Sequence, residues 1–272
     1  MINRLSSYLN EFCYRRFSRR EYLLDRLVAE HRSKWIRDLF TYPSVINNGY
    51  LHFERLFMIA DEMGLKESKG YILDIGGADG VTAIKLYEHF QNAKVRVFEP
   101  IPDNIAVLTK NIHGKDAIEL YPVALGSEKK ETEMTITARI TSSSLLDVNT
   151  RDLGNDYMST QLKPQQKIRI KVDTVDSCMQ AGDTVLLMKL DVQGYELEVL
   201  RGAVNTLRST QLIMAEVQNH ELYKGAPMYH DIDAFLHDNG FVLMDMIPSL
   251  REKMKLMEWD AIYANSNLLK GK

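Results

Sequence analysis

The chain has 272 residues, a length that suits one large domain or two small ones. Hydrophobic residues make up 45% of it and charged residues 26%, a balance that excludes a disordered, fibrous or membrane-embedded protein. The formal net charge of -3 does not supply the broad basic surface that a nucleic-acid-binding protein needs. The composition therefore indicates an ordinary globular protein whose partner is not a nucleic acid.

Residues 1–68 are predicted to form an N-terminal helical accessory region, because their apolar side chains recur at helical spacing. Near its start lies a basic cluster made of Arg15, Arg16, Arg19 and Arg20. We expect this cluster to lie on a helix surface that is solvated or that faces a second copy of the chain in a homodimer. Docking on an anionic substrate or on a membrane surface is the alternative.

The chain holds two cysteines, Cys13 and Cys178, which lie far apart in sequence and lack metal-type spacing. This usage indicates neither a disulfide framework nor a cysteine metal site, and it fits a reducing, cytoplasmic setting. Charged and polar residues interrupt the apolar runs, and no run is long enough to span a bilayer. We therefore expect neither a signal peptide nor a transmembrane span.

Residues 69–272 are predicted to form one α/β domain, because short apolar runs alternate there with helical stretches. The predicted strands lie at 71–75, 95–98, 118–123, 184–190 and 212–217, and the helices at 82–90, 105–111, 196–201 and 232–239. This alternation implies a mostly parallel sheet with helices on both faces. Two further runs, 241–244 and 259–263, are too close for a crossover helix and should form an antiparallel edge pair. The polar segment 127–172 is interpreted as an inserted hairpin and a long loop.

The first predicted strand ends in a glycine-rich turn, Asp-Ile-Gly-Gly-Ala-Asp-Gly at residues 74–80. In open parallel sheets, ligands bind beyond the carboxyl ends of the strands, and small residues there let the backbone approach the ligand closely. A dinucleotide site needs the spacing Gly-x-Gly-x-x-Gly, which no frame starting at Gly76 or Gly77 provides. The turn therefore does not favour a dinucleotide.

The acidic residue at the start of this turn, Asp74, indicates a different cofactor. A carboxylate suits a cationic ligand that carries an ammonium and a sulfonium group, and S-adenosylmethionine is such a ligand. We expect the turn to contact this cofactor through Asp74, Gly76, Gly77, Asp79 and Gly80. A turn that is shaped only for tight strand-to-helix packing, without a cofactor, is the alternative interpretation.

Glu99 ends the second predicted strand, where a carboxylate can accept hydrogen bonds from both ribose hydroxyls. Pro100 follows it and turns the chain into the helix that holds Asn104, which we also expect at the cofactor site. Ser143 belongs to a Ser-rich loop, residues 141–145. This loop could fold over the cofactor and donate hydroxyl hydrogen bonds, or it could simply be flexible.

The segment 189–196, Lys-Leu-Asp-Val-Gln-Gly-Tyr-Glu, together with Val-Leu-Arg-Gly-Ala at 199–203, resembles the most distinctive motif of the FkbM family of methyltransferases. Similar pieces occur in order at 74–80, 97–102, 123–127, 172–176 and 215–217. The resemblance extends over residues 70–263 and leaves the first 68 residues outside it.

This resemblance implies a class I (Rossmann-like) methyltransferase fold with a seven-stranded, mostly parallel sheet. It also implies methyl transfer to an oxygen, commonly a hydroxyl of a sugar or of a polyketide-like product. Because segment 123–127 resembles the family, we also expect Ala124 to contact the cofactor. The family often has a glutamate where this chain has Gln193, so one carboxylate is missing from a cluster that could otherwise hold a metal.

Methyl transfer to an alcohol requires a group that positions the hydroxyl and accepts its proton as the new bond forms. Asp191 closes the fourth parallel strand and is the first candidate for that role, although capping of the following helix is an equally good interpretation. Glu216 ends the fifth strand and His220 follows it, so both could face the same crevice. His220 could act as a base at neutral pH, or it could be a structural or solvated histidine.

A divalent metal is a less favoured alternative, with Asp191, Glu216 and Glu196 as oxygen ligands that would acidify a sugar diol. Glu196 is also explained by the helix dipole, because it lies in the first turn of a predicted helix. Lys189 is expected to be buried in an ion pair within its apolar strand.

Together these features predict an S-adenosylmethionine-dependent O-methyltransferase that acts on a hydroxyl of a small acceptor, a sugar or glycan. O-methylation of a polyketide or peptide natural product is an alternative. Two other classes stay open, namely a nucleotide-dependent oxidoreductase and a non-catalytic binding module whose cofactor site is vestigial.

Overall fold

The computed structural model describes residues 50–150, 156–252 and 254–269. The chain divides into two units, and the larger one, residues 48–250 with 256–272, holds the site described below. Cys13, the basic cluster and residues 1–49 of the predicted accessory region lie outside the described residues. The domain boundary after residue 68 and a homodimer formed through these helices therefore stay predictions.

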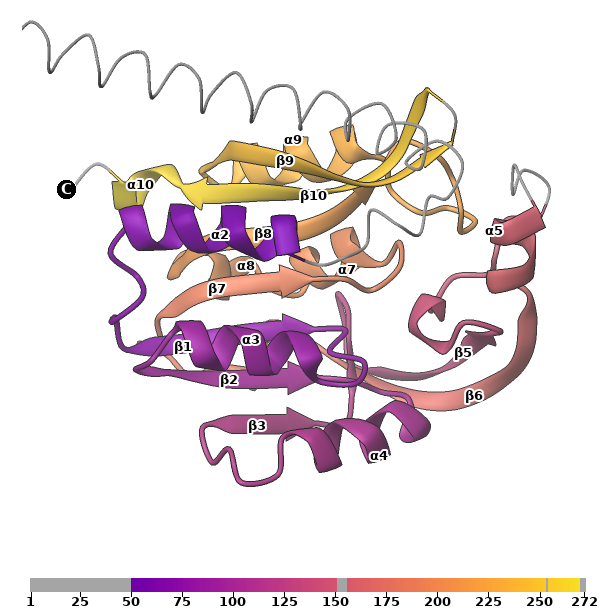
Figure 1. The fold of residues 1–272 in the computed structure, drawn as a ribbon, viewed down its shortest axis with the longest axis horizontal. Helices are drawn as coiled ribbons and strands as arrows, with labels where there is room; N and C mark the ends of the chain where they lie inside the picture. Colours follow the sequence, from indigo (N-terminus) through magenta and orange to yellow (C-terminus); the bar gives the residue numbers. More distant parts are fainter. Residues whose placement is uncertain (1–49, 151–155, 253, 270–272) are drawn as a thin grey trace, which may run out of the picture. The chain divides into compact units, whose positions relative to one another are not determined.

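A seven-stranded sheet forms the centre of the described domain, with strand order β3-β2-β1-β7-β8-β10-β9 (Figure 1). Its strands are β1 (Gly70–Ile75), β2 (Ala93–Phe98), β3 (Ile118–Tyr121), β7 (Val185–Leu190), β8 (Thr210–Gln218), β9 (Phe241–Glu252) and β10 (Lys255–Asn265). β1 pairs in parallel with β2 and β7, β2 with β3, and β7 with β8, whereas β10 runs antiparallel to β8. The predicted mostly parallel sheet with antiparallel strands at one edge is confirmed.

The strand order reverses at β1, because the chain proceeds from β1 to β2 and β3 on one side and then returns to β7 on the other. In register, Asp74 of β1 lies opposite Val97 of β2 and Lys189 of β7. The segments that follow these three strands therefore leave the sheet at the same edge. Such a switch point is where open α/β sheets bind their ligands.

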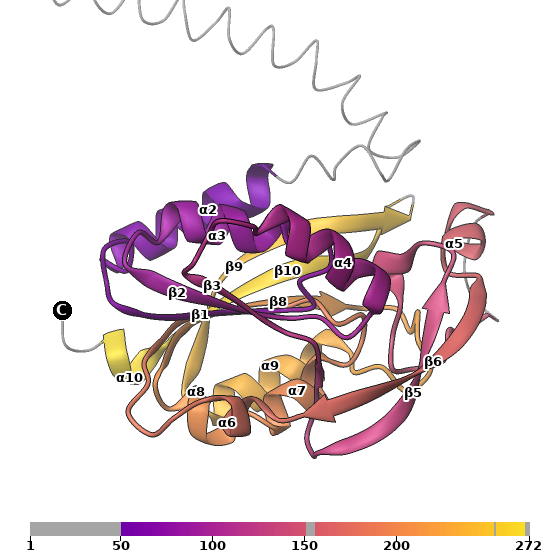
Figure 2. The ribbon, with the colours of Figure 1, turned by 90° about the horizontal axis from the view of Figure 1, so that it is seen from below.

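Helices cover both faces of this sheet (Figure 2). One face carries α2 (Tyr50–Glu62), α3 (Val81–His89) and α4 (Pro102–Asn111), and the other carries α6 (Val175–Cys178), α7 (Glu196–Arg201), α8 (Val204–Leu207) and α9 (Tyr229–Asp238). Each face of the sheet has its own apolar core. Leu56 of α2 and Leu86 of α3 are fully buried in the core under α2, α3 and α4, and Leu236 of α9 is fully buried in the core on the other face. Burial of such apolar surface is the main force that holds the helices on the sheet. A short helix, α10 (Ser266–Leu269), follows β10.

A second, three-stranded sheet of order β4-β6-β5 occupies the predicted insertion. Its strands are β4 (Ala124–Leu125), β5 (Lys130–Thr137) and β6 (Pro164–Asp173), and the connection between β5 and β6 contains η2 (Ile140–Ser142) and α5 (Asp156–Gln161). β5 and β6 pair in antiparallel fashion, while β4 adds a short parallel strand that the sequence did not predict. Met134, Ile136, Ile170 and Val172 alternate along β5 and β6 and pack against Ile101, which lies between β2 and α4.

The last two strands are longer than the sequence predicts. β9 spans 12 residues and β10 spans 11, whereas the apolar runs cover only the segments 241–244 and 259–263. The additional positions include charged residues, such as Asp245, which accepts a hydrogen bond of 2.6 Å from Arg55 of α2. A strand near the edge of a sheet can carry such residues, so a prediction based on apolar runs ends too early. No helix in the described part of the chain is long and apolar enough to cross a bilayer.

Candidate cofactor and active site

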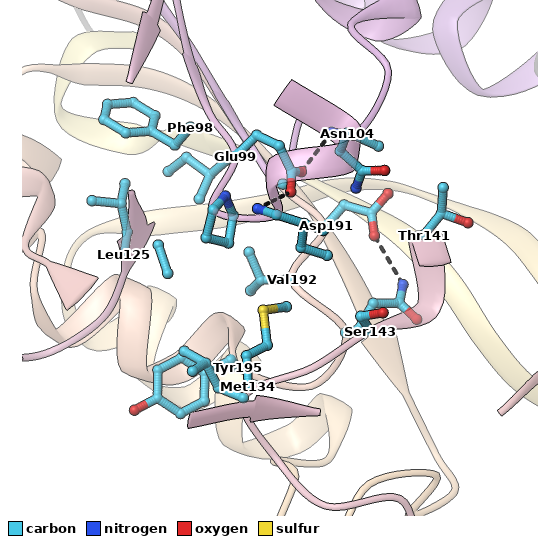
Figure 3. A pocket seen from close by; sticks show the side chains of 18 of the residues that line it. Phe98, Glu99, Asn104, Leu125, Met134, Thr141, Ser143, Asp191, Val192 and Tyr195 are labelled. Carbon is cyan, nitrogen blue, oxygen red and sulfur yellow. Dashed lines mark hydrogen bonds between the residues drawn. The ribbon is translucent and has the colours of Figure 1, made fainter. Parts of the chain in front are cut away.

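A cavity of about 550 Å³ is lined by residues at the carboxyl ends of β1, β2 and β7 and by residues of the second sheet. Figure 3 shows side chains of this lining. Tyr195 and Met134 lie toward one end of it, and Asn104 and Thr141 lie toward the other. The predicted site residues that line this cavity are Gly76, Glu99, Pro100, Asn104, Ala124, Ser143 and Asp191. The structure thus brings most of the predicted cofactor site together around one cavity.

The turn after β1 requires glycine at two successive positions. Gly76 has a φ of 86°, and a Cβ atom there would lie 1.9 Å from the backbone oxygen of Asp191. A Cβ atom on Gly77 would lie 2.1 Å from Cγ1 of Val97. The N–H groups of both glycines donate to the backbone oxygen of Phe98, at 3.0 and 3.2 Å. The turn is therefore packed tightly between β2 and β7, and Gly76 exposes bare backbone to the cavity.

Glu99 connects this turn with the start of α4. Its Oε2 accepts the N–H of Ala78 at 2.9 Å, its Oε1 accepts the N–H of Ile101 at 2.8 Å, and Asn104 donates a further hydrogen bond. Burial raises the pKa of Glu99 to about 7, although these three donors oppose the rise. Carboxylate oxygens accept more than one hydrogen bond each, so Glu99 can still accept from hydroxyl groups in the cavity.

Asp74 is fully buried and is not part of the cavity lining, and neither of its carboxylate oxygens has a hydrogen-bond partner. Burial raises its pKa to about 6, while the ammonium of Lys189 acts in the opposite direction. A buried carboxylate with open acceptors is stabilised by positive charge placed nearby. Asp74 is therefore a group that a cationic ligand bound at the turn would stabilise.

Three other predicted turn residues, Gly77, Asp79 and Gly80, also lie outside the cavity lining. Oδ1 of Asp79 accepts the N–H of Val81 at 3.1 Å, and Gly80 precedes α3 with a φ of 80°. These two residues shape the start of α3. Their contact with a cofactor stays a prediction.

The Ser-rich loop has a defined place in the cavity wall, where Thr141, Ser143 and Leu145 belong to the lining. Oγ of Ser143 accepts the N–H of Thr137 at 3.1 Å, which ties the loop to β5. Oγ of Ser144 donates to the backbone oxygen of Gln193 at 2.7 Å, which ties the loop to the segment after β7. The loop therefore joins the second sheet to the end of β7, and its role in cofactor binding stays a prediction.

Asp191 follows β7 and lines the cavity with a side chain that is 36% exposed. Its Oδ2 pairs with Nζ of Lys189 at 3.1 Å, and its Oδ1 accepts from Nε2 of Gln193 at 3.0 Å. Burial opposes the charge of Asp191, but Lys189 and Gln193 outweigh that effect and hold its pKa below the ordinary value. Asp191 is therefore ionised at neutral pH. The predicted buried ion pair of Lys189 is confirmed, since Lys189 is only 6% exposed.

Glu196 is the carboxylate that organises the segment ahead of α7. Its Oε1 accepts the N–H groups of Val192 and Gly194, at 3.0 and 3.2 Å. The residue is 2% exposed, and burial raises its pKa to about 7. Glu196, rather than Asp191, thus satisfies the backbone amides in front of this helix.

Glu216 lies on the other side of Gln193, whose Nε2 donates to its Oε2 at 2.6 Å. It lines a second cavity of about 240 Å³ together with Glu196 and Glu258. Burial and the charges of Asp191 and Glu258 raise the pKa of Glu216 well above the ordinary value. The amide of Gln193 therefore donates to both Asp191 and Glu216, two of the carboxylates considered as metal ligands. Among residues 50–150, 156–252 and 254–269, no group of three His, Cys, Asp or Glu residues is arranged to hold a metal ion.

His220 follows β8, and its backbone oxygen accepts the N–H of Leu222 at 2.8 Å. It belongs to the lining of neither cavity. Asp191 and Glu216 thus meet through Gln193, whereas His220 lies outside both linings. A role for His220 as the base stays a prediction.

Several lining residues were not among the predicted ones. Val192 and Tyr195 belong to the motif at 189–196 and could have been found there by their place after β7. Tyr195 packs beside Gly126, where a Cβ atom would lie 3.1 Å from its Cε1. Met134 lines the cavity from β5, and its place depends on the packing of the second sheet, which the local sequence does not indicate.

The family model of the methyltransferase FkbM domain matches residues 74–243, a span that contains the glycine-rich turn, Glu99 and Asp191. The chain belongs to the FkbM methyltransferase family. It is therefore a methyltransferase that depends on S-adenosylmethionine. This membership sets aside the oxidoreductase and the non-catalytic module.

Two curated relatives and one solved structure illustrate what this FkbM family member is similar to. The 2-O-methyltransferase NoeI of Sinorhizobium fredii is 30% identical over 171 residues, which cover 59% of this chain and 68% of that protein. Methyltransferase 1 of Beauveria bassiana is 26% identical over 48% of this chain and 57% of that protein. Magnesium protoporphyrin IX methyltransferase from Synechocystis PCC 6803, solved with bound S-adenosylmethionine, aligns with a TM-score of 0.45 and 12% identity over 79% of each chain.

Proposed function

We propose that this chain is an O-methyltransferase that transfers a methyl group from S-adenosylmethionine to a hydroxyl of a small acceptor, a sugar or glycan. The observation that carries the proposal is the Asp191 carboxylate in the lining of the cavity, held by Lys189 and Gln193. A hydroxyl acceptor needs such a group, because it loses its proton as the new bond forms. The 30% identity to a 2-O-methyltransferase supports oxygen as the methylated atom.

The residues around the cavity fit S-adenosylmethionine. Glu99 offers carboxylate oxygens to two ribose hydroxyls, and Gly76 leaves room for close approach of the cofactor to the backbone. The unpartnered carboxylate of Asp74 favours positive charge nearby. Val192 and Tyr195 provide apolar surface suited to a purine ring. When bound, the cofactor supplies an electrophilic methyl group on a positively charged sulfur.

Asp191 would act in this site through its position and its charge. Because its pKa is lowered, it is a weak base and does not deprotonate an alcohol in advance. It instead accepts the hydroxyl proton while the new carbon–oxygen bond forms. Its hydrogen bond to the hydroxyl also orients the acceptor oxygen, which raises the rate by holding the reacting atoms close together.

The experiment that tests this proposal combines calorimetric titration with S-adenosylhomocysteine and transfer of labelled methyl to a panel of methyl glycosides. The wild-type protein should bind S-adenosylhomocysteine and label at least one glycoside. Asp191→Asn should lower kcat by about 100-fold or more and keep S-adenosylhomocysteine affinity close to wild type. Asp116→Asn, which changes an exposed carboxylate outside the cavity lining, is the matched control.

Each outcome of this experiment has a distinct meaning. Failure of the folded protein to bind S-adenosylhomocysteine would overturn the cofactor site. An unchanged kcat in Asp191→Asn would overturn the role of Asp191. If labelled methyl is transferred to a polyketide or peptide natural product and to none of the glycosides, the acceptor is another hydroxylated compound and not a sugar. Turnover that is lost with a chelator and restored by magnesium would favour metal assistance by Asp191, Glu216 and Glu196.

A further inference from the structure

Gln193 has an unusual backbone conformation between the two cavities. Its φ is 56° and that of Gly194 is 91°, so two successive residues are left-handed. A residue with a Cβ atom adopts this conformation at a cost, because the Cβ atom crowds the backbone. Glu196 holds the N–H groups of Val192 and Gly194, and Ser144 donates to the backbone oxygen of Gln193. Contacts from two segments thus fix the direction in which the Gln193 side chain extends.

The hydrogen-bonding groups of the Gln193 side chain are all engaged. Nε2 donates to Oδ1 of Asp191 at 3.0 Å and to Oε2 of Glu216 at 2.6 Å, and Oε1 accepts from the hydroxyl of Tyr223 at 2.9 Å. Gln193 is also the residue that the linings of the two cavities share. A neutral amide that donates its N–H groups to two carboxyl groups stabilises the charge of Asp191 and adds none of its own.

The surroundings of Asp191 contain more carboxyl groups than cationic groups. Lys189 provides the positive charge beside it. The carboxylates that act on Asp191 or on its partners are Asp74 of β1, Glu216 of β8, Glu258 and Asp260 of β10, and Glu196 of α7. Without the amide of Gln193, Oδ1 of Asp191 would lose a donor, while Lys189 would still hold Oδ2. The carboxylate would then be freer to rotate, and its charge would be less well stabilised.

We propose that Gln193 is a positioning residue of the methyl transfer, which holds Oδ1 of Asp191 in place and bridges Asp191 to Glu216. Lys189 fixes only the other oxygen, Oδ2, so both contacts are needed to define the orientation of the carboxylate. This inference rests on the proposed function, because Gln193 acts on the reaction through Asp191. Replacing the amide should therefore change the behaviour of Asp191 itself.

The test compares Gln193→Met with Gln218→Met by NMR. Methionine has a similar length to glutamine and no N–H group. Gln218 lines the same second cavity, but its Nε2 donates to the backbone oxygen of Pro227 at 3.4 Å rather than to a carboxylate. Protein labelled with [γ-13C]aspartate is titrated with acid and base, and the Asp191 resonance is assigned by its loss in Asp191→Asn. Gln193→Met should raise the pKa of Asp191 by about one pH unit, and Gln218→Met should leave it unchanged.

An Asp191 carboxyl that titrates alike in both variants would overturn the inference. If Gln193→Met does not fold, Gln193→Glu serves instead, because a carboxylate at this place should raise the pKa of Asp191 even further. An unchanged pKa of Asp191 in that variant would also overturn it. The titration needs no acceptor, so it is independent of turnover. If the pKa of Asp191 changes as expected but the protein transfers no methyl group, the proposed function is wrong and the contact between Gln193 and Asp191 is still supported.

Discussion

Oε2 of Glu99 accepts the backbone N–H of Ala78 at 2.9 Å, so the end of β2 and the turn after β1 form one connected unit. Ala78 has a φ of 45°, a left-handed conformation that this hydrogen bond helps to hold. The same carboxylate accepts the N–H of Ile101 at the start of α4. The residue expected to bind the ribose therefore also sets the shape of the cavity.

Replacement of Glu99 should weaken cofactor binding strongly. In Glu99→Gln one of the two oxygens becomes an NH₂ group, which cannot accept from a ribose hydroxyl or from a backbone N–H. Loss of a hydrogen bond to a charged group costs about 1.5–3 kcal/mol, so S-adenosylhomocysteine should bind at least about tenfold more weakly. Isothermal titration calorimetry near pH 8 measures this change. Glu88→Gln, at an exposed position of α3, is the control, and equal affinities in the two variants would show that Glu99 does not bind the cofactor.

The raised pKa of Glu99 predicts that cofactor affinity depends on pH. With a pKa of about 7, Glu99 is charged above neutral pH and increasingly protonated below it. If the ribose hydroxyls bind the charged form, the association constant should fall by up to about tenfold per pH unit below pH 7. Glu99→Gln should remove this step and leave any weaker step from Asp74, whose pKa is about 6. A wild-type affinity that stays constant between about pH 6 and pH 8 would contradict the prediction.

Two glycines with similar backbone conformations should differ in their tolerance of alanine. Gly76 and Gly114 have φ values of 86° and 78°, but a Cβ atom on Gly114 would meet no atom within 4 Å. On Gly76 it would lie 1.9 Å from the backbone oxygen of Asp191. Gly114→Ala should lower the free energy of unfolding by about 1 kcal/mol. Gly76→Ala should lower it by about 4 kcal/mol or more, because the backbone must move. Urea denaturation followed by circular dichroism compares the two variants. Equal losses of unfolding free energy would show that the clash between the Cβ atom and the Asp191 backbone is relieved at little cost.

The place of the site could be predicted from the sequence because ligands bind at the carboxyl ends of parallel strands. Asp74, Glu99 and Asp191 each end or follow a strand, and neighbouring parallel strands bring their carboxyl ends to one edge. The alternation of apolar runs and helical stretches was enough to predict those strands. Local sequence therefore located the strand ends around the cavity, and two of the acidic residues at those ends, Glu99 and Asp191, line it.

The second sheet and its residues depend on contacts that local patterns do not encode. Met134 reaches the cavity because β5 pairs with β6 across a long connection and packs beside Ile101. Gln193 was noticed only as a departure from the family motif. Its contact with Asp191 and Glu216 arises from the left-handed backbone at Gln193, which tertiary contacts hold. Periodicity carries no information about such contacts.

Glu196 should make the stability of the protein depend on pH. Its pKa is about 7 in the folded protein, above the ordinary value of 4.5. The folded state therefore holds this proton more tightly than the unfolded state. The resulting stabilisation is fully present below about pH 4.5 and is lost as the pH rises through 7.

Glu196→Gln separates this ionisation from the hydrogen bonds of the same side chain. Both backbone N–H groups donate to Oε1, so the amide oxygen of glutamine can keep them while the charge is removed. Relative to the variant, the wild-type protein should lose about 3 kcal/mol of unfolding free energy between about pH 5 and pH 8. Urea denaturation at both pH values measures the difference, with Glu88→Gln as an exposed control that should follow the wild type. If Glu196→Gln and the wild type lose stability in parallel, ionisation of Glu196 does not contribute to the pH dependence, and the carboxylate acts only as a hydrogen-bond acceptor.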